Sequence, residues 1–190
     1  IASLFGTFKG GVHPPGYKDR TASKPIERMP PPATVFIPLQ QHAGAPCRAL
    51  VKPGDEVAEG QKIGEPVGFI SAAVHAPTSG TVAAVADAVT ASGAWVAAID
   101  IEPDGADAGI PELEGVDKEC REFLNRLEEN PASVRSEALA RIARAGIVGM
   151  GGAGFPTHVK LSPPPDKPID TLVINGAECE PYLTADNRLM

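Results

Sequence analysis

The chain has 190 residues, 43% of them hydrophobic, which is enough to bury a core, and we expect one domain plus part or all of a second. Its net charge of −7 argues against nucleic acid as a partner, because a phosphate backbone needs a basic surface. The three cysteines form no CxxC pair, so their spacing predicts neither a disulfide framework nor a zinc or iron–sulfur site.

The first 33 residues are predicted to be an extended amino-terminal strap. Prolines at 14–15, 25 and 30–32 forbid a continuous helix and favour extended backbone. The chain begins without Met and stops where a helix is expected to begin, so we expect a fragment of a longer protein.

Residues 34–101 are predicted to form an all-β domain. Short β-branched runs at 34–37, 80–85 and 94–101 alternate with turn signals such as Lys52-Pro-Gly-Asp55. A turn–strand–turn pattern over residues 51–64 is repeated less closely at 87–96, which indicates a small pseudo-symmetric unit.

Two helices are predicted after a linker over residues 102–116. Apolar residues recur with a period of 3.6 in the first helix, which ends at Asn130-Pro131; they are Val116, Cys120, Phe123, Leu124 and Leu127. The second helix is predicted to begin with Ser133 as N-cap and to end at Gly146 in the left-handed conformation.

The segment that follows, Gly149-Met-Gly-Gly-Ala-Gly-Phe-Pro-Thr-His-Val-Lys160, is predicted to bind a ligand. Four glycines in six residues let backbone N–H groups approach a phosphate or a flat ring, and Lys160 adds a positive charge. A structural turn would account for one or two of these glycines. Phe155 within the loop could stack on a ring or plug the core beneath it, and both alternatives stay open.

A short buried strand is predicted at residues 171–174, and two acidic residues follow it. Carboxyl ends of strands in α/β sheets are where ligands bind. Glu178 and Glu180 could therefore accept hydrogen bonds from ligand hydroxyl or amide groups beside the glycine-rich segment. The alternative is a solvated acidic turn.

Other reactive side chains predict no chemistry. His13, His42, His75 and His158 share no metal-ligand spacing, so no metal site is expected. Cys179 has no evident base beside it, which argues against a nucleophile.

The 51–80 region resembles a biotinyl/lipoyl-type hammerhead, a barrel-sandwich hybrid. Carriers of that type attach their cofactor to a lysine in the hairpin between the two halves. Here the hairpin reads Phe69-Ile-Ser-Ala-Ala-Val-His75 and holds no lysine, so we expect a scaffold rather than a swinging arm.

Taken together, the chain resembles the RnfC family, the C subunits of the Rnf (Rsx) electron transport complex, over nearly its whole length. The motifs that carry the resemblance are Phe8-Lys-Gly-Gly-Val-His-Pro-Pro15, the hammerhead without its lysine, Gly149–Lys160 and Asn175-Gly-Ala-Glu-Cys-Glu-Pro-Tyr182. The glycine-rich segment is also similar to that of the NADH- and flavin-binding subunit of respiratory complex I.

This resemblance implies that a Rossmann-like α/β domain for FMN and NADH begins within residues 117–190. It implies cofactor contacts from Gly149, Gly151, Gly152, Ala153, Gly154, Phe155, Lys160, Asn175, Glu178 and Glu180. One departure is Ala177, where the complex I subunit has an aspartate that contacts the flavin, so the ribityl contact is lost or supplied elsewhere.

The implied function is electron entry into a membrane-bound, ion-translocating NADH:ferredoxin-type oxidoreductase. NADH would be the substrate and FMN the cofactor, and two 4Fe-4S clusters would lie in a missing carboxy-terminal part, because this chain has no CxxCxxCxxxCP run. Other Rnf subunits would hold the protein peripherally on the cytoplasmic face of the bacterial inner membrane, and the fragment alone would be inactive.

Two alternatives stand beside this interpretation. The chain could be an assembly module, docked on a membrane partner through the hammerhead and the strap without a cofactor. It could also be a cobalamin reductase of a bacterial microcompartment, against which the Gly-Gly-Val-His-Pro segment argues.

Overall fold

The computed structural model describes residues 14–27, 29–90, 93–106, 116–150, 152–164, 166, 169–173, 178 and 180–189. The chain divides into two compact units. One unit joins Ile1–Met29 with Ile169–Met190, and the other is Pro30–Pro168. The domain boundaries proposed from the sequence at residues 33, 101 and 116 stay predictions.

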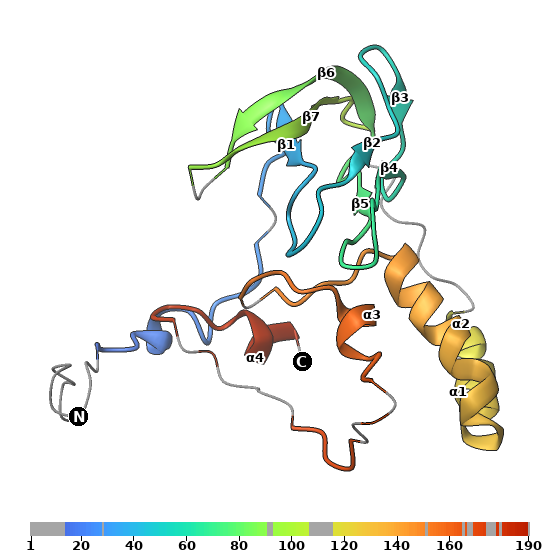
Figure 1. Cartoon of the computed structure of the whole chain (residues 1–190). Helices are drawn as coiled ribbons and strands as arrows, with labels where there is room; N and C mark the ends of the chain where they lie inside the picture. Colours follow the sequence, from blue (N-terminus) through green and yellow to red (C-terminus); the bar gives the residue numbers. More distant parts are fainter. Residues whose placement is uncertain are drawn as a thin grey trace, which may run out of the picture. The chain divides into compact units, whose positions relative to one another are not determined.

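The larger unit begins with a β domain of two antiparallel sheets (Figure 1). The four-stranded sheet has the order β1-β7-β6-β3, with β1 at Val35–Pro38, β7 at Trp95–Pro103, β6 at Gly80–Val89 and β3 at Glu56–Val57. The three-stranded sheet has the order β2-β4-β5, with β2 at Arg48–Ala49, β4 at Lys62–Glu65 and β5 at Val74–His75. The runs predicted at 34–37, 80–85 and 94–101 correspond to β1, β6 and β7.

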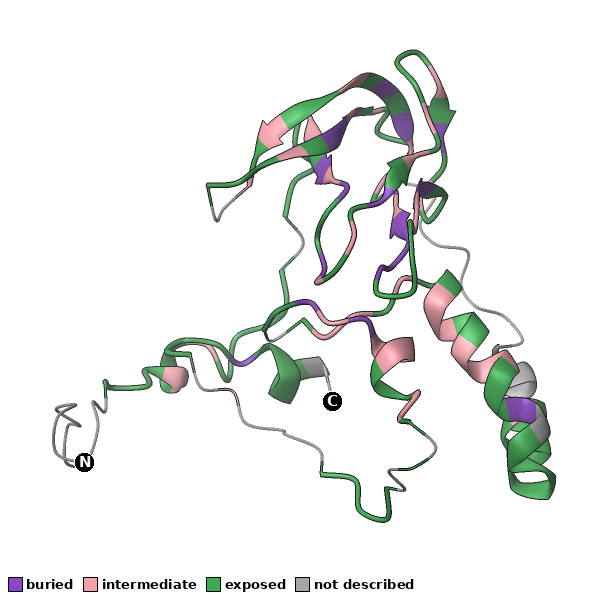
Figure 2. Ribbon diagram, in the orientation of Figure 1, coloured by how far each residue is buried: buried purple, intermediate pink, exposed green. Residues whose placement is uncertain are grey.

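Buried aliphatic side chains from both sheets form the core of this domain (Figure 2). Ile63 on β4 and Ile99 and Ile101 on β7 are fully buried. Burying each such side chain contributes about 1.5–3 kcal/mol of stability. The expectation of a β-rich domain is confirmed.

The turn predicted at Lys52–Asp55 is present and is held by two hydrogen bonds. The Asp55 amide donates to the Lys52 carbonyl at 3.1 Å, and the Lys52 amide donates to the Asp55 carboxylate at 2.9 Å. An aspartate that bonds a nearby backbone amide stabilises such a turn before the next strand begins.

Two helices follow, α1 at Val116–Glu129 and α2 at Pro131–Arg144. Arg126 on α1 and Arg141 on α2 both pair with Glu137, and the Arg141 guanidinium lies 5.3 Å from the centre of the Phe123 ring. The predicted Ser133 N-cap was wrong, because the helix already starts at Pro131, whose fixed φ suits the first helical position.

Gly146 ends α2 with a φ of +67°, as predicted. A Cβ at this position would lie 2.2 Å from the carbonyl oxygen of Ala73, the residue before β5, so the helix end also packs closely against the β domain. Glycine therefore serves both the left-handed turn and this close approach.

The buried strand predicted at 171–174 is not observed in its described part. Residues 171–173 lie outside any strand, and the side chains of Leu172 and Val173 are 78% and 84% exposed. A strand of a parallel sheet needs covering neighbours, and no described segment pairs with these residues. Ile174 lies outside the described residues.

The remaining short elements are a 3₁₀ turn, η1 at Lys18–Arg20, and the helices α3 at Thr157–Lys160 and α4 at Ala185–Leu189. Within the described ranges, no helix combines the length and the apolar character that crossing a bilayer requires.

Candidate functional site

The glycine loop, residues 149–155, follows α2, and its two ends are hydrogen-bonded to each other. Val148 forms an isolated antiparallel bridge with Pro156, and the Gly149 amide donates to the Phe155 carbonyl at 3.0 Å. The Thr157 amide donates to the Ile147 carbonyl, also at 3.0 Å. These bonds fix the base of the loop and leave its middle free to face a ligand.

Most amides in the middle of the loop have no partner within the described part of the chain. The N–H groups of Met150, Gly152, Ala153 and Gly154 donate no hydrogen bond to any described residue. Met150, Gly152 and Ala153 are exposed, so their amides face solvent and can bond water or a ligand with acceptor oxygens.

These amides border a cavity of about 900 Å³. One wall consists of residues 148–150 and 152–154, and the other consists of Gln40, Gln41 and His42 with the β6–β7 ends at Thr90, Ala94 and Val96. Its volume lies within the range of about 300–1,000 Å³ that small-molecule sites occupy.

Gly154 is buried and holds the loop against the β domain. Its carbonyl accepts a hydrogen bond of 3.1 Å from the Ala43 amide. A Cβ on Gly154 would lie 2.8 Å from the Gln41 carbonyl oxygen, and its φ is +63°. The wall formed by Gln40 and Gln41 was not predicted, because the sequence does not show which segment comes this close.

Lys160 lies beside the loop as its spacing predicted. Its ammonium nitrogen is 3.0 Å from the position that a Cβ on Gly149 would occupy, and the residue is exposed. The positive charge therefore stands next to the first glycine of the loop, where it can meet an anionic ligand. Phe155 is half-buried, which leaves open both of its predicted roles.

Helix α3, which carries Lys160, docks on the hairpin that would hold the cofactor lysine in a carrier. The His158 ring nitrogen Nε2 is 3.2 Å from the Phe69 carbonyl oxygen, and the two rings meet edge to face at 6.1 Å. His158 was considered only as a metal ligand in the sequence, and its contact with Phe69 was not foreseen.

The two acidic residues lie in the other unit, so their distance from the glycine loop is not defined. Glu178 is half-buried, and its Oε1 accepts a 2.7 Å hydrogen bond from the Asp186 amide in α4. Glu180 is exposed. Gly151, Asn175, Ala177 and Cys179 lie outside the described residues.

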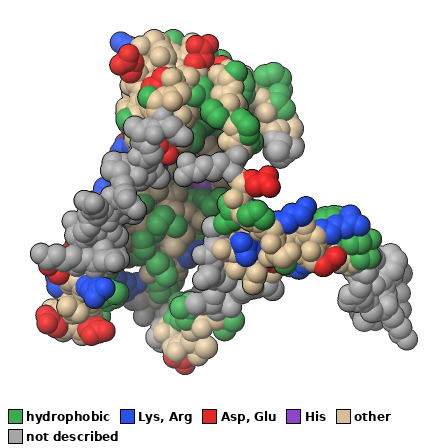
Figure 3. Space-filling model, turned by 180° about the vertical axis from the view of Figure 1, so that it is seen from behind, with side chains coloured by type: hydrophobic (Ala, Val, Ile, Leu, Met, Phe, Trp, Pro, Cys, Tyr) green, Lys and Arg blue, Asp and Glu red, His purple; other side chains and the backbone are tan. Residues whose placement is uncertain are grey.

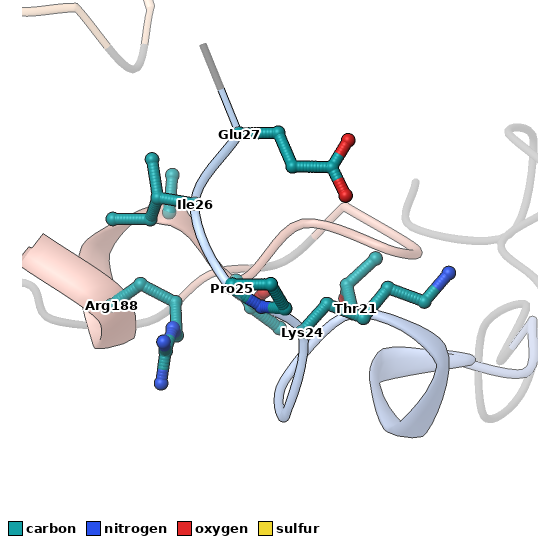
Figure 4. A pocket seen from close by; sticks show the side chains of 8 residues that line it. Thr21, Lys24, Pro25, Ile26, Glu27 and Arg188 are labelled. Atoms are coloured by element: carbon teal, nitrogen blue, oxygen red, sulfur yellow. The ribbon is translucent and has the colours of Figure 1, made fainter.

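A second cavity, of about 480 Å³, lies within the smaller unit (Figure 4). Its cationic side chains, Lys24 and Arg188, point apart rather than toward a common centre (Figure 4). An anion site needs donors that converge, so this cavity does not match the expected phosphate chemistry.

A buried polar cluster in the β domain serves structure. The Ser71 hydroxyl donates to the Ala45 carbonyl at 2.8 Å and lies 3.0 Å from His42 Nε2. The Cys47 thiol donates to the Ala72 carbonyl at 2.9 Å, and burial raises the pKa of this thiol. A buried, protonated thiol is a poor nucleophile.

Two family models match the chain. The RnfC barrel sandwich hybrid domain matches residues 6–106, and the Nuo51 FMN-binding domain matches residues 142–190. The second match spans the glycine loop, Lys160 and both acidic residues.

Several curated proteins are similar over almost the whole chain. The C subunit of the Na(+)-translocating ferredoxin:NAD(+) oxidoreductase complex of Acetobacterium woodii is 49% identical over 185 residues, covering 97% of this chain and 39% of the relative. The C subunit of the proton-translocating complex of Clostridium ljungdahlii is 49% identical, covering 98% and 38%. The C subunit of the ion-translocating oxidoreductase complex of Rhodobacter capsulatus is 47% identical, covering 100% and 36%.

Proposed function

The chain belongs to the RnfC family, and on this premise we propose that its glycine loop binds FMN in the subunit through which electrons enter or leave an ion-translocating oxidoreductase complex. The chain spans less than two fifths of the length of the relatives named above, so the activity concerns the longer subunit. The observation that carries the proposal is the row of open amides in the glycine loop beside a cavity of about 900 Å³.

The residues of the loop fit a phosphorylated ring system. The amides of Gly152, Ala153 and Gly154 can donate to phosphate or carbonyl oxygens, and Lys160 adds a cation. Gly152 has no side chain to keep a flat ring away from the backbone, and a Cβ there would enter open space. Gly149 lines the same cavity, and we propose that Gly151 also contacts the cofactor.

FMN, when bound, would exchange a hydride with NAD(H) and pass single electrons onward. The protein's part is to orient the ring and to exclude water. We propose that Phe155 stacks on the nicotinamide, that Asn175 donates to the flavin, and that Glu178 and Glu180 accept hydrogen bonds from the hydroxyl or amide groups of the two nucleotides.

We further propose that residues 117–190 belong to a Rossmann-like domain, as the match to the Nuo51 FMN-binding domain supports. In this proposal two 4Fe-4S clusters elsewhere in the longer subunit take the electrons. The other subunits of the complex hold the protein peripherally at the cytoplasmic face of the membrane.

The test is a visible absorbance spectrum of the full-length subunit reconstituted with FMN. A flavin band that NADH bleaches is the expected result. Absence of any bound flavin at excess FMN would refute the proposal.

The variant Lys160→Ala tests whether Lys160 contributes to FMN binding. We expect the dissociation constant for FMN to rise about tenfold, because one charge-assisted hydrogen bond to the ligand is lost. Lys52→Ala is the matched control, since Lys52 is an exposed lysine in a turn of the β domain. An unchanged dissociation constant in Lys160→Ala would refute the role of Lys160.

A second candidate function, assembly, is favoured by a different observation. Hydrophobic side chains reach the surface of the β domain (Figure 3). The cross-strand pair Val89 and Trp95 is 55% and 72% exposed. We propose that this surface docks on the membrane subunits of the complex, so Trp95→Ser should reduce co-purification with them without changing FMN affinity.

A further inference from the structure

The amino-terminal strap is fastened to the acidic turn of its own chain. Within the smaller unit, the Tyr182 amide donates to the Gly16 carbonyl at 2.8 Å. The Thr21 hydroxyl donates to the Tyr182 carbonyl at 2.7 Å. The two segments are more than 150 residues apart in sequence, so these bonds close a long loop and hold the turn in place.

Lys18 is the centre of this attachment. Its ammonium donates to the carbonyl oxygens of Glu178 at 2.5 Å and Leu183 at 2.8 Å, and a longer contact of 3.5 Å reaches the carbonyl of Glu180. An ammonium has three donors, and here all three face backbone oxygens of one turn. Lys18 is half-buried, so water competes less for these bonds than at the surface.

Aromatic contacts reinforce the same attachment. The rings of Tyr17 and Tyr182 stack with their centres 5.2 Å apart and 15° between their planes. The Arg20 guanidinium lies 4.8 Å and 5.8 Å from the two ring centres. Both tyrosines have a positive φ, 49° and 65°, which side-chain-bearing residues seldom adopt without tertiary support.

We propose that Lys18 is a positioning residue for nucleotide binding, and that it acts by fixing the backbone at residues 178, 180 and 183. With the backbone fixed, the Glu178 side chain caps α4 at the Asp186 amide, while Glu180 is presented to solvent. The inference rests on the proposed function, in which Glu178 and Glu180 contact the nucleotides.

The experiment compares Lys18→Met, which keeps the length of the side chain and removes its charge, with the wild type in the full-length subunit. We expect the KM for NADH and the dissociation constant for FMN to rise about tenfold, with kcat at saturating NADH within about twofold. Hydrogen–deuterium exchange of residues 178–189 should become faster. Lys18→Arg should recover part of the affinity.

Lys24→Met is the matched control, since Lys24 is an exposed lysine of the same strap, and it should leave all three measurements unchanged. Thr21→Val removes the hydrogen bond to the Tyr182 carbonyl, with a longer one of 3.3 Å to the Lys18 carbonyl, at nearly the same side-chain volume, and should produce a smaller change in the same direction. It keeps the proposal testable if Lys18→Met does not fold.

The two proposals fail in distinguishable ways. A wild-type subunit that binds neither FMN nor NADH refutes the proposed function. A wild-type subunit that binds both, with unchanged affinities in Lys18→Met and Thr21→Val, overturns only the role of Lys18. A lowered melting temperature with unchanged affinity for both nucleotides overturns it as well, because Lys18 would then serve stability alone.

Discussion

Glycine is used for different physical reasons in the β domain and in the glycine loop. In the β domain, a Cβ on Gly44 would lie 2.0 Å from the Ile70 carbonyl oxygen, and one on Gly64 would lie 2.9 Å from the Val74 Cβ. At Gly152 a Cβ would meet nothing within 4 Å, and its φ is outside the left-handed region. The described fold therefore does not require a glycine at position 152, which agrees with the proposal that a ligand lies against it.

The largest effect is expected at Gly44. Gly44→Ala should lower the free energy of unfolding by about 3 kcal/mol, since it combines the cost of a positive φ with a backbone clash. Urea denaturation followed by circular dichroism measures this change. Gly54→Ala is the matched control: its φ is +90° but a Cβ there has open space, so only the conformational cost, about 1 kcal/mol, should appear.

Gly154 stands between the two cases, because it belongs to the glycine loop yet packs against the β domain. A Cβ would lie 2.8 Å from the Gln41 carbonyl oxygen, a milder clash than at Gly44. We expect Gly154→Ala to cost about 2 kcal/mol of stability. A loss below roughly 0.5 kcal/mol, the level of neutral surface changes, would show that the loop does not rest on residues 41–42.

The contrast between these glycines also shows what the sequence could predict. The four glycines predict that the loop binds a ligand, which stays a prediction, and the described part of the loop borders a cavity. The sequence could not separate Gly154, which is needed for packing, from Gly152, which is not. That distinction depends on the approach of Gln41, a contact over more than 100 residues that no local pattern encodes.

Gly152→Ala should separate binding from folding. We expect the stability to change by less than about 0.5 kcal/mol, because the new methyl group enters open space. The dissociation constant for FMN in the full-length subunit should rise about tenfold or more, as the methyl group displaces the ligand from the backbone. Equal FMN affinity in the variant and the wild type would mean that the ligand does not lie against this glycine.

A similar limit applies to the apolar run at residues 171–174. Its composition is that of a buried strand, but Leu172 and Val173 are exposed and unpaired among the described residues. Composition reports what a segment can form, whereas a strand also needs a partner that supplies its hydrogen bonds. The β domain was predictable because each of its strands has an antiparallel partner within the same 70 or so residues, as is common for such domains.

His75 gives the smallest effect and tests how α2 meets the β domain. Burial lowers its pKa from 6.5, and Lys62 acts in the same direction, while a hydrogen bond to the Arg144 backbone opposes the shift. The unfolded chain therefore binds the proton more tightly, so His75 should reduce stability as the pH falls from about 7 through 6.5. The loss should be less than about 1 kcal/mol, because the side chain is only half-buried.

The variant His75→Gln cannot titrate at this position and is the reference, since the carboxylates contribute equally to the stability of both proteins. The stability difference between wild type and variant, measured by urea denaturation from about pH 7.5 to about pH 5.5, should shift against the wild type at low pH. A stability difference that stays constant over this range would mean that protonation of His75 does not change the free energy of unfolding.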